Sequence, residues 1–148
     1  MSLRDEIEDT LYQYAWGYDD DDIALLSSAF ADGATLNHAL DGSTLTGPAE
    51  IHAWMDEKRG VFRDAGEQPR HMLANVVVTR ESETEATARC YMTMVVTRSD
   101  GTVYVHHAGR YFDRFVRVGD RWLFSERLIR VDRDVDFAHR KTPAGARG

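Results

Sequence analysis

The chain has 148 residues, of which 43% are hydrophobic and 29% charged, a composition typical of one globular domain. Its 18 basic and 25 acidic residues give a formal net charge of −7, so a nucleic acid or an anionic membrane would be repelled. Cys90 is the only cysteine, which excludes an internal disulfide and a cysteine-rich zinc site. The amino terminus lacks a signal-peptide pattern and no run of 18 apolar residues occurs, so we expect a cytoplasmic protein that does not span a membrane.

Three helices are expected in the first 62 residues. Apolar side chains recur at helical spacing over about residues 4–18 and again over about 22–30, with Asp22 capping the second helix. A short strand is expected at 34–38. The third helix begins at Pro48 and includes residue 62, and Gly60 weakens its end.

The rest of the chain has the composition of β-strands. Four segments rich in Val, Thr, Tyr and Phe, at about 70–80, 85–98, 102–117 and 120–132, are separated by turn residues. Helices followed by strands predict an α+β fold, in which the helices cover one face of a curved antiparallel sheet. We expect a single domain over residues 1–132, followed by a partly disordered carboxyl-terminal extension over 133–148.

The motifs of several large enzyme classes are absent from the sequence. There is no glycine-rich phosphate loop, no HExxH or CxxC motif and no Gly-x-Ser-x-Gly turn. Nucleotide hydrolysis, hydride transfer and serine esterase chemistry are therefore disfavoured. Histidine, aspartate, tyrosine and arginine side chains remain, and they suit acid–base catalysis if the fold brings them together.

Each of these candidate residues also has an ordinary structural interpretation. Asp19 follows the aromatic end of the first helix, but a run of four aspartates commonly caps helices in solvent. His71 opens a strand, where a histidine is often only a structural hydrogen-bonding group. His106 and His107 are neighbours on one strand, so only one of them is expected to face the interior. Arg127 alternates with apolar residues, and a buried guanidinium requires a carboxylate or a substrate anion as its partner.

Two further strand patterns indicate which side chains share a face of the sheet. Met92 and Met94 share a strand face with Cys90, and this face forms either plain core or the wall of a cavity for an apolar ligand. The period of two also predicts that Leu123 and Arg127 share one face of the last strand.

Several short motifs, in this order and spacing, resemble a known family. They are Tyr14-Ala15, Tyr18-Asp19, Asp22, Phe30-Ala31-Asp32-Gly33-Ala34, Arg70-His71, Gly109-Arg110-Tyr111-Phe112-Asp113-Arg114 and Trp122-Leu123-Phe124-Ser125-Glu126-Arg127. Over about residues 5–132 the chain resembles SnoaL-like proteins of the nuclear transport factor 2-like superfamily. The resemblance implies a cone-shaped α+β barrel with three amino-terminal helices, a fold that carries many different activities.

Two enzyme families of this superfamily are similar to the chain locally. Scytalone dehydratase has a Tyr-Asp pair and a later histidine at the positions of Tyr18, Asp19 and His71, and hexachlorocyclohexane dehydrochlorinase has the Asp and His as a catalytic dyad. His38 stands where the scytalone enzyme has a second catalytic tyrosine, so the same substrate is not expected. The catalytic residues implied are Asp19, His71, Tyr18 and Arg127. The residues expected to bind the substrate are Tyr14, Leu36, His38, Trp54, Met92, Met94, His107 and Tyr111.

The activity expected from this resemblance is that of a dehydratase or isomerase that needs no cofactor or metal and acts on a small apolar, cyclic or polyketide-like molecule. Asp19 would orient His71, which would remove a proton next to a carbonyl group. Two alternatives without catalysis are a module resembling the small (beta) subunit of aromatic-ring-hydroxylating dioxygenases and a small-molecule-binding protein. A limonene-type epoxide hydrolase is disfavoured, because only the arginine of its Asp-Arg-Asp constellation can be placed, at Arg127.

A homodimer is expected from the outer face of the predicted sheet. Tyr104, Phe112 and Val116 would lie on the face opposite Tyr111, and exposed apolar side chains of this kind commonly mark an interface. A trimer, or coverage of this face by a helix, is the alternative.

Overall fold

The computed structural model describes residues 1–39 and 41–132, and the extension predicted over 133–148 lies outside them. The helices are α1 (Leu3–Asp19), α2 (Ile23–Ser27) and α3 (Gly47–Ala65). The strands are β1 (Phe30–His38), β2 (Ser43–Thr46), β3 (Gln68–Arg80), β4 (Glu85–Thr97), β5 (Val103–Val118) and β6 (Arg121–Val131). Within the described part of the chain, no helix is long and apolar enough to cross a membrane.

Local sequence accounts for the start of α1 and of α2. Ser2 and Asp5 form a reciprocal capping box at the first turn of α1, so the backbone donors there are satisfied. Asp22 caps α2, because its carboxylate accepts a hydrogen bond from the backbone N–H of Leu25 at 3.1 Å. The cap predicted at Asp22 is thus confirmed.

Two helix ends differ from the prediction. The second helix ends at Ser27 rather than near residue 30, because Phe30 begins β1 and pairs with Phe124 of β6. The third helix continues past Gly60 to Ala65, where Gly66 adopts the left-handed conformation (φ 68°) that ends helices well. Strand β2 was not predicted; it is only four residues long and pairs with β1.

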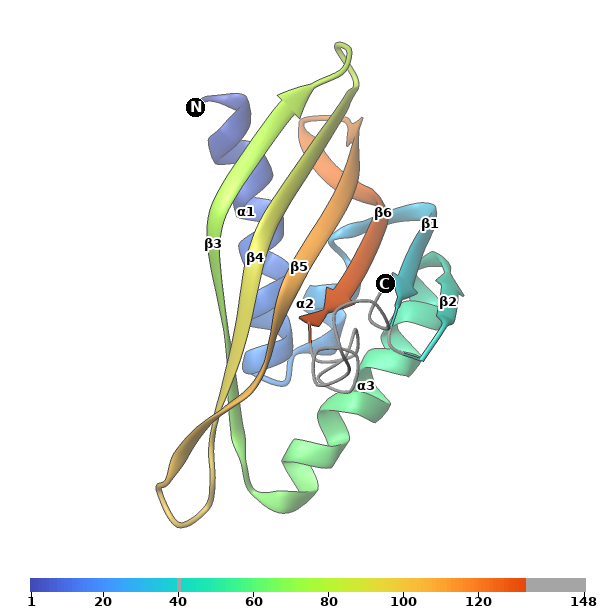
Figure 1. Ribbon diagram of the computed structural model, residues 1–148. Helices are drawn as coiled ribbons and strands as arrows, with labels where there is room; N and C mark the ends of the chain where they lie inside the picture. The colour runs from blue at the N-terminus through green and yellow to red at the C-terminus, as the bar shows by residue number, and fades with distance from the viewer. Residues whose placement is uncertain (40, 133–148) are drawn as a thin grey trace, which may run out of the picture.

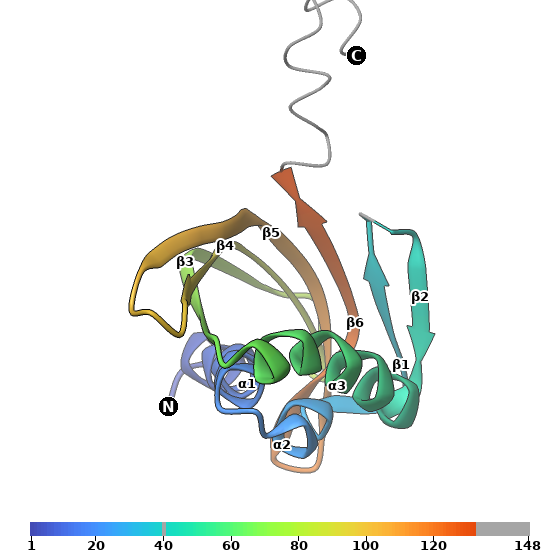
Figure 2. The ribbon, with the colours of Figure 1, turned by 90° about the horizontal axis from the view of Figure 1, so that it is seen from below.

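The six strands form one curved sheet in the order β2-β1-β6-β5-β4-β3 (Figure 1). Figure 2 shows the sheet curving from β3 round to β1 and β2, with α1 and α3 across its open side. The expected α+β architecture is therefore correct, but two details of it are wrong. The sheet is mixed, because β1 runs parallel to β6, and it is open rather than closed into a barrel.

Register shifts within the sheet change which side chains face inward. His107 of β5 pairs with Met94 of β4, whereas Val105 of β5 pairs with the next residue of β4, Val95. His106 is therefore an extra residue, as in a β-bulge. In β6, Phe124 pairs with Phe115 of β5, whereas Glu126 pairs with the adjacent Arg114. Ser125 is therefore an extra residue in the same way. These two bulges interrupt the strict alternation that the sequence predictions assumed.

The concave face of the sheet and the inner faces of α1 and α3 form one hydrophobic core. α1 packs on β3 and β6, and α3 packs on β1, β2 and β3. The predicted inward face of β4 is confirmed, since Cys90, Met92 and Met94 are all at most 2% exposed. Burial raises the pKa of the Cys90 thiol to about 11, so it is a packing group rather than a nucleophile.

Candidate active site

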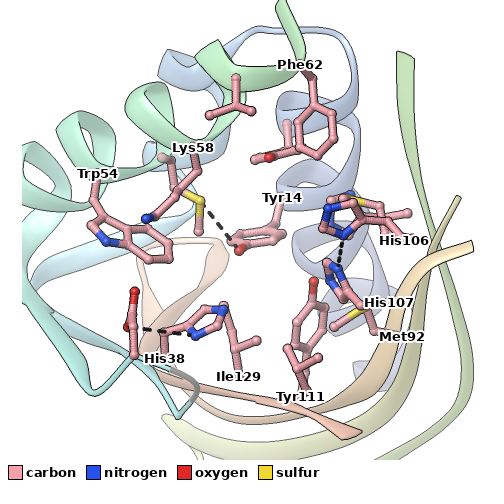
Figure 3. A pocket seen from close by; sticks show the side chains of 17 residues that line it. Tyr14, His38, Trp54, Lys58, Phe62, Met92, His106, His107, Tyr111 and Ile129 are labelled. Atoms are coloured by element: carbon pink, nitrogen blue, oxygen red, sulfur yellow. Dashed lines mark hydrogen bonds and ion pairs between the residues drawn. The ribbon is translucent and has the colours of Figure 1, made fainter. Parts of the chain in front are cut away.

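A cavity of about 270 Å³ lies between the concave sheet face and the helices α1 and α3 (Figure 3). Its wall is mainly aromatic, methionine and aliphatic, with a few titratable groups. The lining residues are Tyr14, Tyr18, His38, Asp41, Trp54, Met55, Lys58, Val61, Phe62, His71, Met92, Met94, His106, His107, Tyr111, Ile129 and Val131. A cavity of this size and polarity suits a small, largely apolar ligand held by a few polar groups.

Asp19 and His71 form a hydrogen-bonded pair at the edge of this cavity. One carboxylate oxygen of Asp19 lies 2.8 Å from Nδ1 of His71, and the other accepts the backbone N–H of His71, also at 2.8 Å. The two side chains are 10% and 7% exposed, respectively. Because both carboxylate oxygens bind the same residue, the imidazole is held in one orientation, and Nε2 is the ring nitrogen left to act on a ligand.

The carboxyl-terminal end of α1, which carries Asp19, is itself held by buried groups. Nε of Arg59, from α3, donates to the carbonyl of Tyr18 at 2.8 Å, and its Nη2 donates to the carbonyl of Asp19 at 3.2 Å. The amide of Gln68, at the start of β3, donates to the same Asp19 carbonyl at 2.8 Å. Arg59 is only 5% exposed, so this cap is a fixed part of the interior. It was missed in the sequence, where Arg59 is one residue of a charged helical segment.

Two tyrosines of α1 lie beside the pair. The ring centroid of Tyr18 is 5.0 Å from that of His71, and the Tyr14 centroid is 6.5 Å from it. Burial raises the pKa of Tyr14 to about 12, although the charge of Arg127 acts in the opposite direction. Burial also raises the pKa of Tyr18 above its ordinary value. Both hydroxyls therefore stay protonated at neutral pH and are available as hydrogen-bond donors.

Arg127 does not reach the cavity. Its side chain is completely buried and forms two hydrogen bonds to Asp113, at 2.7 and 2.9 Å. Its guanidinium carbon lies 4.2 and 3.7 Å from the ring centroids of Tyr14 and Tyr111, which separate it from the cavity. Burial opposes the charge of Arg127, but Asp113 outweighs this effect and raises the pKa of the guanidinium. The partner that the sequence required for Arg127 is a carboxylate of the protein.

The bulge in β5 brings both neighbouring histidines to the cavity, so the expectation that only one faces inward was wrong. His106 and His107 both line the wall, with their Nδ1 atoms 2.6 Å apart. The prediction that Leu123 and Arg127 share a strand face was also wrong. Because of the bulge in β6, Phe124 lies on the buried face with Arg127, whereas Leu123 is only partly buried.

Seven of the eight residues expected to bind the substrate lie in the cavity wall. They are Tyr14, His38, Trp54, Met92, Met94, His107 and Tyr111. Leu36, the eighth, is fully buried in the core and is not part of the wall. Lys58 lines the cavity but was not expected to, although its place in the apolar stripe of α3, four residues after Trp54, was a signal for it. Over residues 1–39 and 41–132, no group of three or more potential metal ligands occurs.

The comparisons with known proteins agree with this architecture. A family model described as a SnoaL-like domain matches residues 1–128, so the chain belongs to the SnoaL-like family. This family includes polyketide cyclases and scytalone dehydratase-like enzymes, and the resemblance seen in the sequence is confirmed. No curated protein has a significant sequence match to the chain.

Three solved structures illustrate the likeness. Aln2 from a Streptomyces species is 28% identical with a TM-score of 0.81, over 88% of this chain and 91% of Aln2. A putative scytalone dehydratase from Novosphingobium aromaticivorans is 23% identical (TM-score 0.74, 87% of this chain and 83% of that one). An NTF2-like protein with a cystatin-like fold from the same species is 24% identical (TM-score 0.76, 97% and 86%). The latter two show the shared nuclear transport factor 2-like fold.

Proposed function

We propose that the chain is a cofactor-independent lyase or isomerase in which Asp19 and His71 perform general acid–base catalysis on a small apolar, cyclic or polyketide-like substrate. The observation that carries this proposal is the geometry of the pair. Both oxygens of the Asp19 carboxylate bind His71, which lies in the wall of an otherwise mainly apolar cavity. A histidine held in this way has a defined tautomer and a stabilised imidazolium form.

In the proposed mechanism His71 removes a proton from the carbon next to a carbonyl group. The proton moves to Nε2, the C–H electron pair enters the carbonyl system, and an enolate forms. Tyr18, whose ring lies nearer to His71 than that of Tyr14, stays protonated because its pKa is raised, and it donates a hydrogen bond to the developing oxyanion. The His71 imidazolium then returns the proton to a departing hydroxyl group or to another carbon, which gives dehydration or isomerisation.

Arg127 has a less direct role in this proposal than the sequence implied. Its charge lies against the rings of Tyr14 and Tyr111 without facing the cavity. We therefore assign Arg127 and Asp113 as positioning residues, which hold the two aromatic rings in place from behind. This fixes the position of both rings in the cavity wall and leaves proton transfer to His71.

A screen of candidate substrates with mass spectrometry tests the proposal. Wild type and His71→Ala would be incubated with β-hydroxy ketones and cyclic polyketide intermediates. We expect wild type alone to give products that have lost the mass of water or have rearranged at constant mass. His52→Ala is the matched control, because His52 lies on α3 outside the cavity wall and bonds to Ser27. Equal turnover by wild type and His71→Ala would contradict the proposal.

The two non-catalytic alternatives predict no product in this screen. A protein that only binds small molecules would hold them without changing their mass, in wild type and variant alike. A module resembling a dioxygenase small subunit would instead form a complex with an iron-containing large subunit. The inward position of the Asp19–His71 pair, in which both side chains are at most 10% exposed, favours the enzyme over these alternatives.

A further inference from the structure

A single lysine interrupts the inner face of α3. Met55, Lys58 and Phe62 follow one another at helical spacing, and all three line the cavity. Lys58 and Lys141 are the only lysines among the 18 basic residues of the chain. An ammonium group at an otherwise apolar position is unfavourable for folding alone, since a cation near low-dielectric walls loses hydration. Its position therefore calls for a functional explanation.

The surroundings of the Lys58 amine leave it able to take an anionic partner. Its nitrogen lies 5.1 Å from the ring centroid of Trp54, and this cation–π contact fixes the amine beside the indole. Among the residues that the structure describes, no carboxylate lies within ion-pair distance of it. The nearest acidic group of the cavity wall is Asp41, on which the charge of Lys58 acts without forming an ion pair. In contrast, Arg63, one turn further along α3, is paired with both Asp21 and Asp56.

The hydroxyl of Tyr14 points toward the same wall. It lies 3.8 Å from the sulfur of Met55, one turn before Lys58 on α3. Figure 3 shows Lys58 and Trp54 on one side of Tyr14, and His106 and His107 on the other. The α3 wall thus combines a positive charge, an aromatic face and a hydroxyl donor, whereas the general base of the proposed mechanism, His71, belongs to β3.

We propose that Lys58 and Tyr14 form a subsite for a carboxylate group of the substrate, with Trp54 packing on the ring that bears it. The subsite deepens the proposed function, on which it rests, because it assigns the substrate class as an aromatic or cyclic carboxylic acid. The ammonium of Lys58 and the hydroxyl of Tyr14 each donate to a carboxylate oxygen, and such charge-assisted hydrogen bonds are stronger than neutral ones. The low-dielectric walls strengthen the attraction further.

The subsite can be tested by binding alone, without knowledge of the natural substrate. Isothermal titration calorimetry would compare 2-naphthoate with its neutral analogue 2-naphthamide. We expect wild type to bind 2-naphthoate about tenfold or more tightly than 2-naphthamide. Lys58→Met should bring the two affinities within about twofold of each other, and Lys58→Arg should retain most of the preference. Thermal melting of each variant would confirm that it is folded.

Two controls make the result specific. Arg63→Met removes a positive charge from the same helix but from outside the cavity wall, so it should keep the preference for 2-naphthoate. His71→Asn should also keep it, since binding of the carboxylate does not need the base. Equal affinity of wild type for the two probes, no binding of either, or an unchanged preference in Lys58→Met would overturn the inference. Because turnover is not measured, these outcomes are distinct from a failure of the Asp19–His71 mechanism.

Discussion

Three aspartates of the run at residues 19–22 have three different partners. Asp19 binds His71, Asp21 forms an ion pair with Arg63, and Asp22 caps α2. The capping role of Asp22 was predictable, because it depends on residues that follow directly in sequence. The role of Asp19 depends on a strand about 50 residues further along, and only the family resemblance pointed to it. Nothing in the local pattern indicated that Arg59 would hold this end of α1.

The buried pair of Asp113 and Arg127 provides a prediction about stability. Both side chains are inaccessible to solvent. Asp113→Leu is expected to lower the free energy of unfolding, measured by urea denaturation, by about 3–5 kcal/mol, because Arg127 then stays charged and buried without a partner. The double variant Asp113→Leu with Arg127→Met should be less destabilised than Asp113→Leu alone.

A neighbouring pair serves as the control for this prediction. Arg114 and Glu126 occupy the same two strands but are 60% and 47% exposed, with 3.8 Å between them. Arg114→Met should therefore change the free energy of unfolding by no more than about 1 kcal/mol. If Asp113→Leu cost as little as Arg114→Met, the buried pair would not have the structural role assigned to it.

At the level of elements, the contact between α1 and α2 depends on a glycine. A Cβ atom added at Gly17 would lie 2.7 Å from the backbone nitrogen of Leu26 and 3.0 Å from the carbonyl oxygen of Asp22. Glycine to alanine in a helix normally stabilises by about 1 kcal/mol. We expect Gly17→Ala instead to destabilise by roughly 1–3 kcal/mol, because backbone atoms cannot move aside as a flexible side chain can.

Gly60 in α3 is the matched control for this substitution. A Cβ atom there meets only the end of the Arg63 side chain, at 3.3 Å. Gly60→Ala should therefore leave the melting temperature unchanged or raise it, while Gly17→Ala lowers it. A gain in stability in both variants would show that the helices do not approach each other as closely as described.

The strands show where prediction from sequence fails at this level. Four of the six were predicted closely, because long runs of β-forming residues are separated by turns. The bulges at His106 and Ser125 were not predicted, since an extra residue depends on the register with the neighbouring strand. Because of the bulge at His106, Tyr104 pairs with the buried Val96 and packs on the core. The prediction that Tyr104 shares the outer sheet face with Phe112 was therefore wrong.

For the molecule as a whole, the order of helices and strands was sufficient to predict an α+β fold with helices across one face of a curved sheet. The openness of the sheet and the parallel pairing of β1 with β6 were not predictable from it, because both depend on where distant segments meet. Most of the predicted cavity wall is present, yet Lys58 was missing from the prediction and Leu36 was wrongly included in it. The homodimer expected through the outer sheet face stays a prediction, which light scattering of the purified protein would check.

The decisive step of the proposed mechanism is the removal of a proton from carbon by His71. Its most direct test is solvent deuterium exchange, which detects this step even when no net product forms. Wild type and His71→Asn would be incubated in D₂O with cyclic and β-hydroxy ketones, and deuterium at the carbon next to the carbonyl would be followed by mass spectrometry. Asparagine is chosen because its amide can still donate to Asp19. We predict that exchange is about 10²–10⁴-fold slower in His71→Asn than in wild type. Exchange at the same rate in both proteins would contradict the claim.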